Sequence, residues 1–393
     1  MSNQHNNIFL TGVTGAVGSH LLYEFLRKYA EKAYTGQLIL LVRPNSKTGD
    51  TAYQRVVNLL TSKYRPNYLN QYSLPQLLSY IEVVSCDLGS ETLEQQLAKY
   101  HSLKNCYVIH SAATTNLSTG EKAHEENYRV NYCGSLNLLN ACKSFAVKFT
   151  FISTAYSCGV QEGLIPNDYN QLEKTNFRNP YETIKAKLEL KLAKECSALS
   201  IKYQIIRPAI VCGRLLDAPL NVISNFSVFY ANIKFFYYAK AKGATESVEI
   251  ACNPDIDIHI TPVDYVAKIV VQAFSNDALS VINIAPEKGM NVSKVIDIII
   301  QDIGYTNIEI VEQQGTPKNV MTHLYVKKVG AVFGPYITTS PFEFEVSLLK
   351  EILPNVEVPD VATHFSDLLS FAIQHKFTAL ESIAKQSSEK VLA

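Results

Sequence analysis

The stretch Thr11-Gly12-Val13-Thr14-Gly15-Ala16-Val17-Gly18 decides the fold of this chain. The apolar run Ile8-Phe9-Leu10 precedes it, and an amphipathic segment from Ser19 to Lys28 follows it. Its three glycines allow a sharp turn from a strand into a helix, close approach of the backbone to a pyrophosphate, and tight packing of the helix on the strand. Because the N-terminus of a helix attracts phosphate, this order of strand, turn and helix predicts a dinucleotide site.

Beyond this turn, apolar runs alternate with amphipathic segments, which is typical of a parallel sheet with helices on both faces. We predict an α/β fold, a Rossmann-type doubly wound parallel sheet with a smaller C-terminal substrate lobe. The predicted strands are Ile8–Leu10, Leu38–Val42, Ile81–Ser85, Cys106–His110, Lys148–Ser153, Tyr203–Arg207 and Ser280–Asn283. The predicted helices are Val17–Tyr29, Tyr53–Lys63, Glu91–Lys99, His124–Phe145, Tyr181–Leu199 and one that begins near Val263.

The predicted domains follow from this order of elements. Residues 1–285 are expected to form the dinucleotide-binding Rossmann domain, with a substrate-lobe insertion at about 215–255. Residues 286–393 are expected to form the C-terminal substrate lobe.

Composition excludes several classes of protein. Lysine plus arginine and aspartate plus glutamate number 36 each, so no overall field attracts nucleic acid. No run of eighteen apolar residues predicts a transmembrane segment, and the polar start is unlike a secretory signal, so we expect a cytoplasmic protein. The eight cysteines lie singly without a C-x-x-C pair, so we expect buried structural thiols and no metal site.

Arg43, after the second predicted strand, bears on the choice of cofactor. An acidic residue there would accept the ribose hydroxyls of NAD, whereas an arginine pairs with the 2′-phosphate of NADP. Arg43 therefore favours NADP(H). The alternative interpretation is that Arg43 is an ordinary loop residue.

Tyr181 and Lys185 are candidate catalytic residues. Their i, i+4 spacing places both side chains on one face of a helix. A lysine ammonium beside a phenol stabilises the phenolate and lowers its pKa, which makes the tyrosine a usable proton donor. The same spacing occurs at Tyr100 with Lys104 and at Tyr230 with Lys234, so an exposed helical pair is the alternative.

Hydroxyl residues end the fifth predicted strand at Ser153-Thr154, where a parallel sheet opens onto its cleft. Thr154 is therefore a candidate donor to a substrate oxygen. With these motifs in this order, the sequence resembles the extended short-chain dehydrogenase/reductases. Its closer resemblance is to their thioester reductase and fatty acyl-CoA reductase branch, because the insertion Pro44–Tyr80 and the segment Pro262–Ala267 are similar to that branch.

The motifs that carry the resemblance span residues 8 to about 285. They are the following: Thr11–Gly18, Leu41-Val42-Arg43, Cys86-Asp87-Leu88, His110–Asn116, Val130–Ser135, Ser153–Tyr156, Tyr181–Lys185, Arg207–Val211 and Pro262–Ala267. Two positions depart from the family pattern, since Cys86 replaces a glycine and Ser135 a threonine.

The resemblance implies a role for each matching position. The pyrophosphate would be held by Gly12, Thr14, Gly15, Ala16, Val17 and Gly18, and the 2′-phosphate by Arg43. The adenine would lie against Asp87 and Leu88, and the nearby ribose and phosphate against Ala112, Ala113 and Thr114. The nicotinamide would be flanked by Pro208, Ala209, Ile210 and Val211, with Lys185 also on its ribose and Tyr181 beside it. Thr154, Tyr181 and Lys185 would be catalytic, and Asn131 would support the backbone.

The expected function is the NADPH-dependent reduction of an acyl thioester to an aldehyde, with the alcohol as a further product. The acyl group would be carried by coenzyme A or a separate carrier protein. The alternatives are a sugar-nucleotide epimerase or dehydratase, a hydroxysteroid-type dehydrogenase, or a non-catalytic NADP-binding protein. The oligomeric state is left open.

Two further features have two interpretations each. The aromatic segment Val222–Tyr238 is expected to be lobe core, with an acyl channel or peripheral membrane contact as alternatives. Asp264 is expected to cap the helix near Val263, with a catalytic role as the alternative.

Overall fold

A seven-stranded parallel sheet forms the centre of the computed structural model, which describes residues 4–169 and 175–380. Its strands are β2 (Asn7–Thr11), β4 (Leu38–Val42), β5 (Ile81–Ser85), β6 (Cys106–His110), β7 (Ala146–Ile152), β9 (Lys202–Pro208) and β14 (Val281–Ile284). The order across the sheet is β5-β4-β2-β6-β7-β9-β14. The direction of winding reverses between β2 and β6, which is where open α/β sheets bind ligands.

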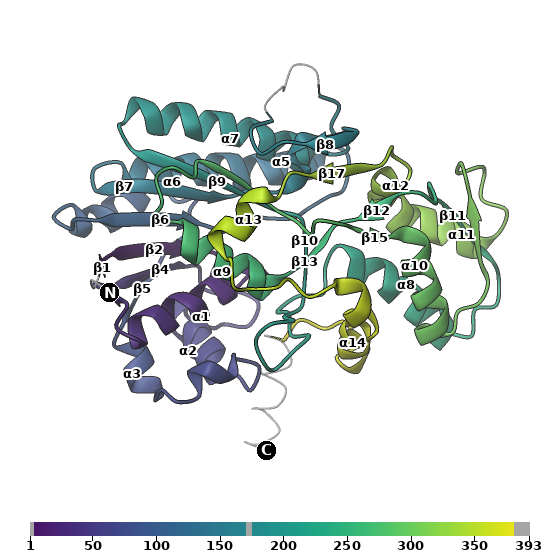
Figure 1. The fold of residues 1–393 in the computed structure, drawn as a ribbon, viewed down its shortest axis with the longest axis horizontal. Coiled ribbons are helices and arrows are strands. Elements are labelled where there is room, and N and C mark those ends of the chain that lie inside the picture. The colour runs from purple at the N-terminus through teal and green to yellow at the C-terminus, as the bar shows by residue number, and fades with distance from the viewer. Residues whose placement is uncertain (1–3, 170–174, 381–393) are drawn as a thin grey trace.

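Helices cover both faces of this sheet (Figure 1). Ile8 and Leu10 point to one face of β2 and Phe9 to the other, because side chains alternate along a strand. The first face packs against α1 (Ala16–Ala30), α2 (Ala52–Thr61), α3 (Leu74–Leu78) and α9 (Val263–Ala273). The second packs against α4 (Leu93–Leu97), α6 (Gly134–Cys142) and α7 (Pro180–Ala198). The predicted Rossmann-type sheet is therefore confirmed.

The predicted helix His124–Phe145 is divided in the structure. It consists of α5 (Glu121–Asn127), a π-helical segment (Tyr128–Cys133) and α6. Asn131 lies in the π-helical segment. Its Oδ1 accepts a hydrogen bond from the backbone amide of Thr114, and its Nδ2 donates one to the carbonyl oxygen of Thr114.

A smaller lobe lies beside the carboxyl ends of the strands (Figure 1). Its core joins side chains from 209–256 with side chains from 285–377. Its helices are α8 (Phe229–Ala241), α10 (Val292–Ile298), α11 (Val320–Tyr325), α12 (Ala331–Ile337) and α14 (Val361–Gln374). Its short strands are β10 (Ile210–Cys212), β11 (Val248–Ala251), β12 (Asp257–Ile258), β13 (Ile260–Pro262), β15 (Met290–Asn291) and β16 (Ile308–Val311).

Two segments of the C-terminal part contact elements from the first half of the chain. Strand β17 (Phe342–Phe344) pairs in parallel with β8 (Gly163–Ile165). Helix α13 (Ser347–Ile352) places Leu349 and Ile352 in the same core as α1 and α9. The remaining short strands, β1 (Gln4–His5) and β3 (Tyr34–Thr35), pair near the start of β2.

The aromatic segment is mostly core. Phe226, Tyr230 and Phe236 are buried in the lobe, whereas the ring of Tyr238 is partly exposed. Within the described residues, no helix is both long and apolar enough to cross a bilayer.

Asp264 differs from its predicted role. Pro262 takes the N-cap position of α9, so Asp264 is the second helical residue. Its carboxylate accepts hydrogen bonds from the amides of Leu216 at 2.7 Å and Asp217 at 2.8 Å. The prediction of an N-cap was therefore wrong, because the carboxylate binds a loop that lies far away in the sequence.

Candidate active site

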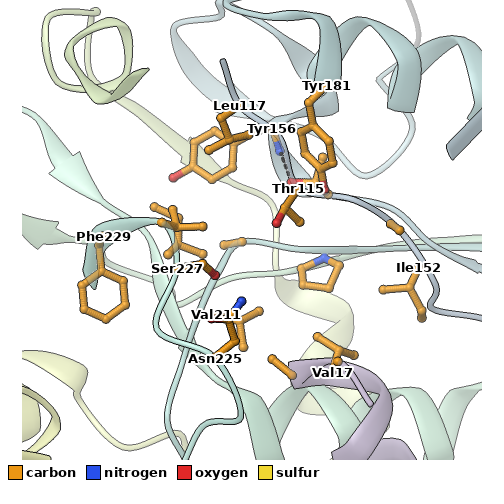
Figure 2. A pocket seen from close by; sticks show the side chains of 18 of the residues that line it. Val17, Thr115, Leu117, Ile152, Tyr156, Tyr181, Val211, Asn225, Ser227 and Phe229 are labelled. Carbon is orange, nitrogen blue, oxygen red and sulfur yellow. Dashed lines mark hydrogen bonds between the residues drawn. The ribbon is translucent and has the colours of Figure 1, made fainter. Parts of the chain in front are cut away.

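A cavity of about 370 Å³ lies between the carboxyl edge of the sheet and the smaller lobe. Figure 2 shows Tyr181 and Val17 on opposite sides of this hollow, with Phe229 on the side away from Ile152. The sheet side contributes Thr14, Gly15, Ala16, Val17, Gly18, Ser111, Ala113, Thr154, Tyr181, Lys185, Pro208, Ala209, Ile210 and Val211. Most of the sequence-predicted site residues are thus brought together from five separate stretches of the chain.

The glycine turn is shaped to hold a pyrophosphate. Gly12 has φ +75°, and a Cβ on it would lie 2.6 Å from the amide nitrogen of Ala112. A Cβ on Gly18 would overlap the carbonyl oxygen of Gly12. Helix α1 begins after Gly15 with no side-chain cap and no acidic residue in its first turn. Its first amides and its dipole therefore favour an anion, and the turn fits a dinucleotide cofactor.

Arg43 and Asp87 lie together at the ends of β4 and β5, outside the lining of the cavity. Arg43 Nη1 is 3.6 Å from Asp87 Oδ2, and both side chains are more than half exposed. Asp87 Oδ1 accepts a hydrogen bond from the amide of Gly89 at 2.8 Å. Leu88 follows in the same loop, and its carbonyl oxygen accepts a hydrogen bond from Asn137.

The loop after β6 alternates between two environments. Ser111, Ala113, Thr115 and Leu117 line the cavity. The intervening residues are bonded to the protein instead: the Ala112 amide donates to Thr11, and the Thr114 hydroxyl donates to Glu126 at 3.0 Å. The structure therefore places Ala113 in the cavity, whereas Ala112 and Thr114 are outside its lining.

Thr154 stands at the end of β7, where the strand passes into a short 3₁₀ turn (Ala155–Cys158). Its Oγ1 accepts a hydrogen bond from the amide of Tyr156 at 3.3 Å. Because the oxygen is used as an acceptor, the hydroxyl proton is available for donation into the cavity.

Tyr181 and Lys185 project from the first two turns of α7. Asn179 caps this helix through a hydrogen bond from the Glu182 amide to its Oδ1, and Pro180 occupies the first turn. Tyr181 is 8% exposed. Lys185 donates to the carbonyl oxygen of Ile152 at 2.9 Å, and its Nζ lies 5.8 Å from the ring centroid of Tyr181.

The pKa values of this pair differ from the sequence-based expectation. Burial raises the pKa of the Tyr181 phenol, and the negative charges of Glu182 and Glu189 raise it further. Burial lowers the pKa of Lys185 to about 7, against the opposing effect of Glu189. Desolvation of both groups therefore outweighs the predicted lowering of the tyrosine pKa by the lysine.

Glu189 and Arg207 form a buried ion pair that sequence reasoning missed. Arg207 Nη2 is 2.5 Å from Glu189 Oε2, and Glu189 also accepts hydrogen bonds from Ser153 and Ser157. The spacing of Glu189 four residues after Lys185 was the available signal, because it extends the same helix face. This pair ties α7 to the ends of β7 and β9.

The lobe side of the cavity is largely apolar, and the sequence analysis found only part of it. It includes Tyr156, Ile223, Phe229, Ile258, Phe333, Tyr336, Ile337 and Phe342, with Asn225, Ser227, Asn232 and Asp257 as polar members. Five of these residues, Ile223, Asn225, Ser227, Phe229 and Asn232, belong to the segment Val222–Tyr238, for which an acyl channel was the alternative interpretation, and Tyr156 ends the motif Ser153–Tyr156. Among the described residues, no group of three histidine, cysteine, aspartate or glutamate side chains is placed to hold a metal ion.

Comparison with known proteins gives a family match and two curated relatives. The family model described as male sterility protein, a NAD-binding family, matches residues 10–270. The L-2-aminoadipate reductase large subunit of Eremothecium gossypii is 25% identical over an alignment of 300 residues that covers 70% of this chain and 20% of that protein. Probable fatty acyl-CoA reductase 5 of Arabidopsis thaliana is 29% identical over 202 residues, 49% of this chain and 39% of that protein. The chain thus matches less than half the length of these relatives.

Solved structures share the fold. The terminal R domain from the myxalamid PKS-NRPS biosynthetic pathway has a TM-score of 0.68 at 17% identity, covering 96% of this chain and 93% of that chain. UDP-glucuronic acid 4-epimerase from Bacillus cereus has a TM-score of 0.61 at 17% identity, covering 93% and 99%. At these identities the likeness shows the fold alone.

Proposed function

Because this chain belongs to the male sterility protein family, within the thioester reductase branch of the extended short-chain dehydrogenase/reductases, we propose that it uses NADPH to reduce an acyl thioester to an aldehyde. The observation that carries this proposal is the meeting of Thr154, Tyr181 and Lys185 with an apolar wall in one cavity. An apolar wall suits an acyl chain better than it suits a sugar nucleotide, whose hydroxyls require hydrogen-bonding partners.

The family and the fold establish a nicotinamide cofactor, and NADP in preference to NAD is part of the proposal. Arg43 supports it, because an exposed guanidinium at the end of β4 can pair with a 2′-phosphate. No acidic side chain follows β4 directly, since Val42 is succeeded by Arg43, Pro44 and Asn45.

The bound cofactor supplies the hydride that reduces the thioester carbonyl carbon. In this proposal Thr154 Oγ1 and Tyr181 Oη donate hydrogen bonds to the carbonyl oxygen and stabilise the negative charge that develops there. Cleavage of the carbon–sulfur bond then leaves an aldehyde and a thiol, with the Tyr181 phenol supplying the proton. A second round of reduction would give the alcohol.

Lys185 has two roles in this proposal. Its hydrogen bond to the Ile152 carbonyl holds α7 against the end of β7, and its ammonium stabilises negative charge near Tyr181. The pKa of Lys185 is about 7. A negative charge that develops nearby favours the protonated form of this lysine, so the ammonium keeps its proton during the reaction.

The location of the protein is also a proposal. All eight cysteines are free thiols, seven of them buried, which suits a reducing compartment such as the cytoplasm. Fractionation of cells that express the full-length protein would test this assignment.

A substrate panel tests the proposed reaction. Purified protein is incubated with NADPH and with acyl-CoA and acyl-carrier-protein thioesters, while nicotinamide absorbance and products by mass spectrometry are followed. We expect thiol release, NADPH oxidation and an aldehyde or alcohol with at least one carrier. Absence of turnover across the panel, together with turnover of a UDP-sugar without added cofactor, would overturn the proposal in favour of an epimerase.

A further inference from the structure

Helix α12 belongs to the lobe but forms part of the cavity wall. Phe333, Tyr336 and Ile337 all line the cavity. The ring of Tyr336 packs edge-on against Tyr156, with centroids 5.4 Å apart and an interplanar angle of 81°. An acyl group that fills the apolar side of the cavity therefore touches α12.

The phenol of Tyr336 is bound at the start of the helix that carries Tyr181. Asn179 Nδ2 donates to Tyr336 Oη at 2.7 Å, and the Tyr336 hydroxyl is hydrogen-bonded to the carboxylate of Glu182. The other end of the Asn179 amide caps α7, since Oδ1 accepts from the Glu182 amide at 3.0 Å. One asparagine side chain thus links the cap of α7 to α12.

Arg178 makes a second connection between the two helices. Its Nε donates to the carbonyl oxygen of Pro335 at 3.1 Å, and its guanidinium carbon lies 5.0 Å from the centroid of the Tyr336 ring. Its Nη1 is 3.3 Å from Glu182 Oε1, with both side chains at most 2% exposed. Separating α12 from α7 would leave Arg178 Nε and Asn179 Nδ2 without these acceptors, so the two helices are expected to move together.

We propose that Tyr336 is a positioning residue through which the acyl group, by filling the wall formed by α12, aligns Tyr181 for reaction. This inference rests on the proposed thioester reduction and adds to it a dependence of rate on the acyl chain. Tyr336 acts through Asn179 and Glu182, so its effect falls on turnover more than on binding. Small misplacements of a reacting group are costly enough to make this visible.

The test compares acetyl-, butanoyl-, octanoyl- and dodecanoyl-CoA in wild type and two variants. Tyr336→Phe removes the hydroxyl, and Asn179→Ser keeps a capping oxygen but removes the donor to Tyr336. In wild type we expect kcat to rise once the chain reaches α12. In each variant, kcat for the long chains falls about tenfold towards the short-chain value, while KM changes less than about threefold.

Two comparisons make this result specific. Tyr305→Phe is the matched control, because its hydroxyl donates to the Glu246 carbonyl within the lobe and its ring is absent from the cavity lining. In the double variant of Tyr336 and Asn179, kcat for the long chains should fall no further than in either single variant, because both substitutions remove the same hydrogen bond. Additive losses, or an unchanged chain-length dependence in the variants, would overturn the inference.

Amide hydrogen exchange separates this inference from the proposed reaction. The amides of Glu182 and Thr183 should exchange faster in Tyr336→Phe and Asn179→Ser than in wild type or Tyr305→Phe. If wild type reduces no thioester, the proposed function fails, and exchange still reports on the link. Equal exchange in all four proteins would overturn the link itself.

Discussion

Lys185 Nζ donates a hydrogen bond to the carbonyl oxygen of Ile152 at 2.9 Å, which joins this candidate catalytic residue to the strand that leads to Thr154. Ile152 ends β7, and Thr154 follows two residues later. The ammonium also lies 4.4 Å from the ring centroid of Phe151, on the same strand. The side chain of Lys185, itself a candidate catalytic residue, therefore helps to fix the distance between Thr154 and Tyr181.

Replacement of Tyr181 by phenylalanine should remove most turnover. Loss of a positioned proton donor typically costs a factor of about 10² to 10⁴ in rate. The dissociation constant for NADPH, measured by fluorescence titration, should stay within about twofold. Retention of more than a tenth of the wild-type kcat would refute the assignment of the proton donor.

Lys185 should make stability depend on pH in a defined direction. Its pKa is about 7 in the folded protein, lowered by burial from 10.5. Between about pH 10 and pH 7 the unfolded chain therefore binds a proton that the folded chain does not, so the free energy of unfolding falls as the pH falls. Below about pH 7 both states are protonated and the loss is complete.

The variant Lys185→Met isolates this effect. Urea unfolding at a series of pH values should show wild type losing stability relative to the variant from about pH 10 down to about pH 7, and no further relative change below. A constant difference between the two proteins across the whole range would contradict the lowered lysine pKa.

Arg43→Leu should weaken NADPH binding and spare NADH. A charge-assisted hydrogen bond to a phosphate contributes about 1.5 to 3 kcal/mol, which corresponds to roughly a 10- to 150-fold rise in the dissociation constant for NADPH. Isothermal titration with both cofactors measures this. Equal affinity of wild type for NADPH and NADH would remove the basis for the NADP assignment.

Gly18→Ala should damage the cofactor site, because the added methyl group would overlap the carbonyl oxygen of Gly12. Overpacking of this kind typically costs about 1 to 3 kcal/mol, so the NADPH dissociation constant or the melting temperature should change accordingly. Gly315→Ala is the matched control, since a Cβ there meets no atom within 4 Å. The idea fails if both variants bind NADPH like wild type.

Glu189→Gln should destabilise the protein by about 3 to 5 kcal/mol, because it leaves the buried Arg207 guanidinium without its counter-charge. Glu195→Gln removes the partner of Lys191 at an exposed site of the same helix and should leave the unfolding curve in place. Chemical denaturation of both variants gives the comparison. Similar curves for the two would show that the buried pair contributes little.

The central sheet could be predicted because its strands are short apolar runs separated by helices. The predicted bounds of β4, β5 and β6 agree with the structure, and those of β2, β7, β9 and β14 differ by one or two residues at each end. Local signals were sufficient here, since a buried parallel strand and a glycine turn are both defined by neighbouring residues.

The lobe wall could not be predicted in the same way. Phe333, Tyr336 and Phe342 lie about 150 residues after Tyr181 in the sequence, and nothing in their neighbourhood resembles a site. Asp264 shows the opposite problem, because a local capping pattern was present but the carboxylate binds loop amides elsewhere. For Tyr181, the spacing to Lys185 suggested a lowered pKa, whereas burial by distant segments raises it.

In the loop from Ser111 to Leu117, the residues that line the cavity alternate with the residues that hold the loop in shape. Substitutions at Ala113, Thr115 or Leu117 alter the surface that a substrate meets, while the bonds of Thr114 to Asn131 and Glu126 hold the loop in shape. Substitutions at every second residue can therefore change the substrate preference without lowering the stability of the loop. Among active relatives of this chain, we expect the amino acids to vary most at the positions equivalent to 111, 113, 115 and 117.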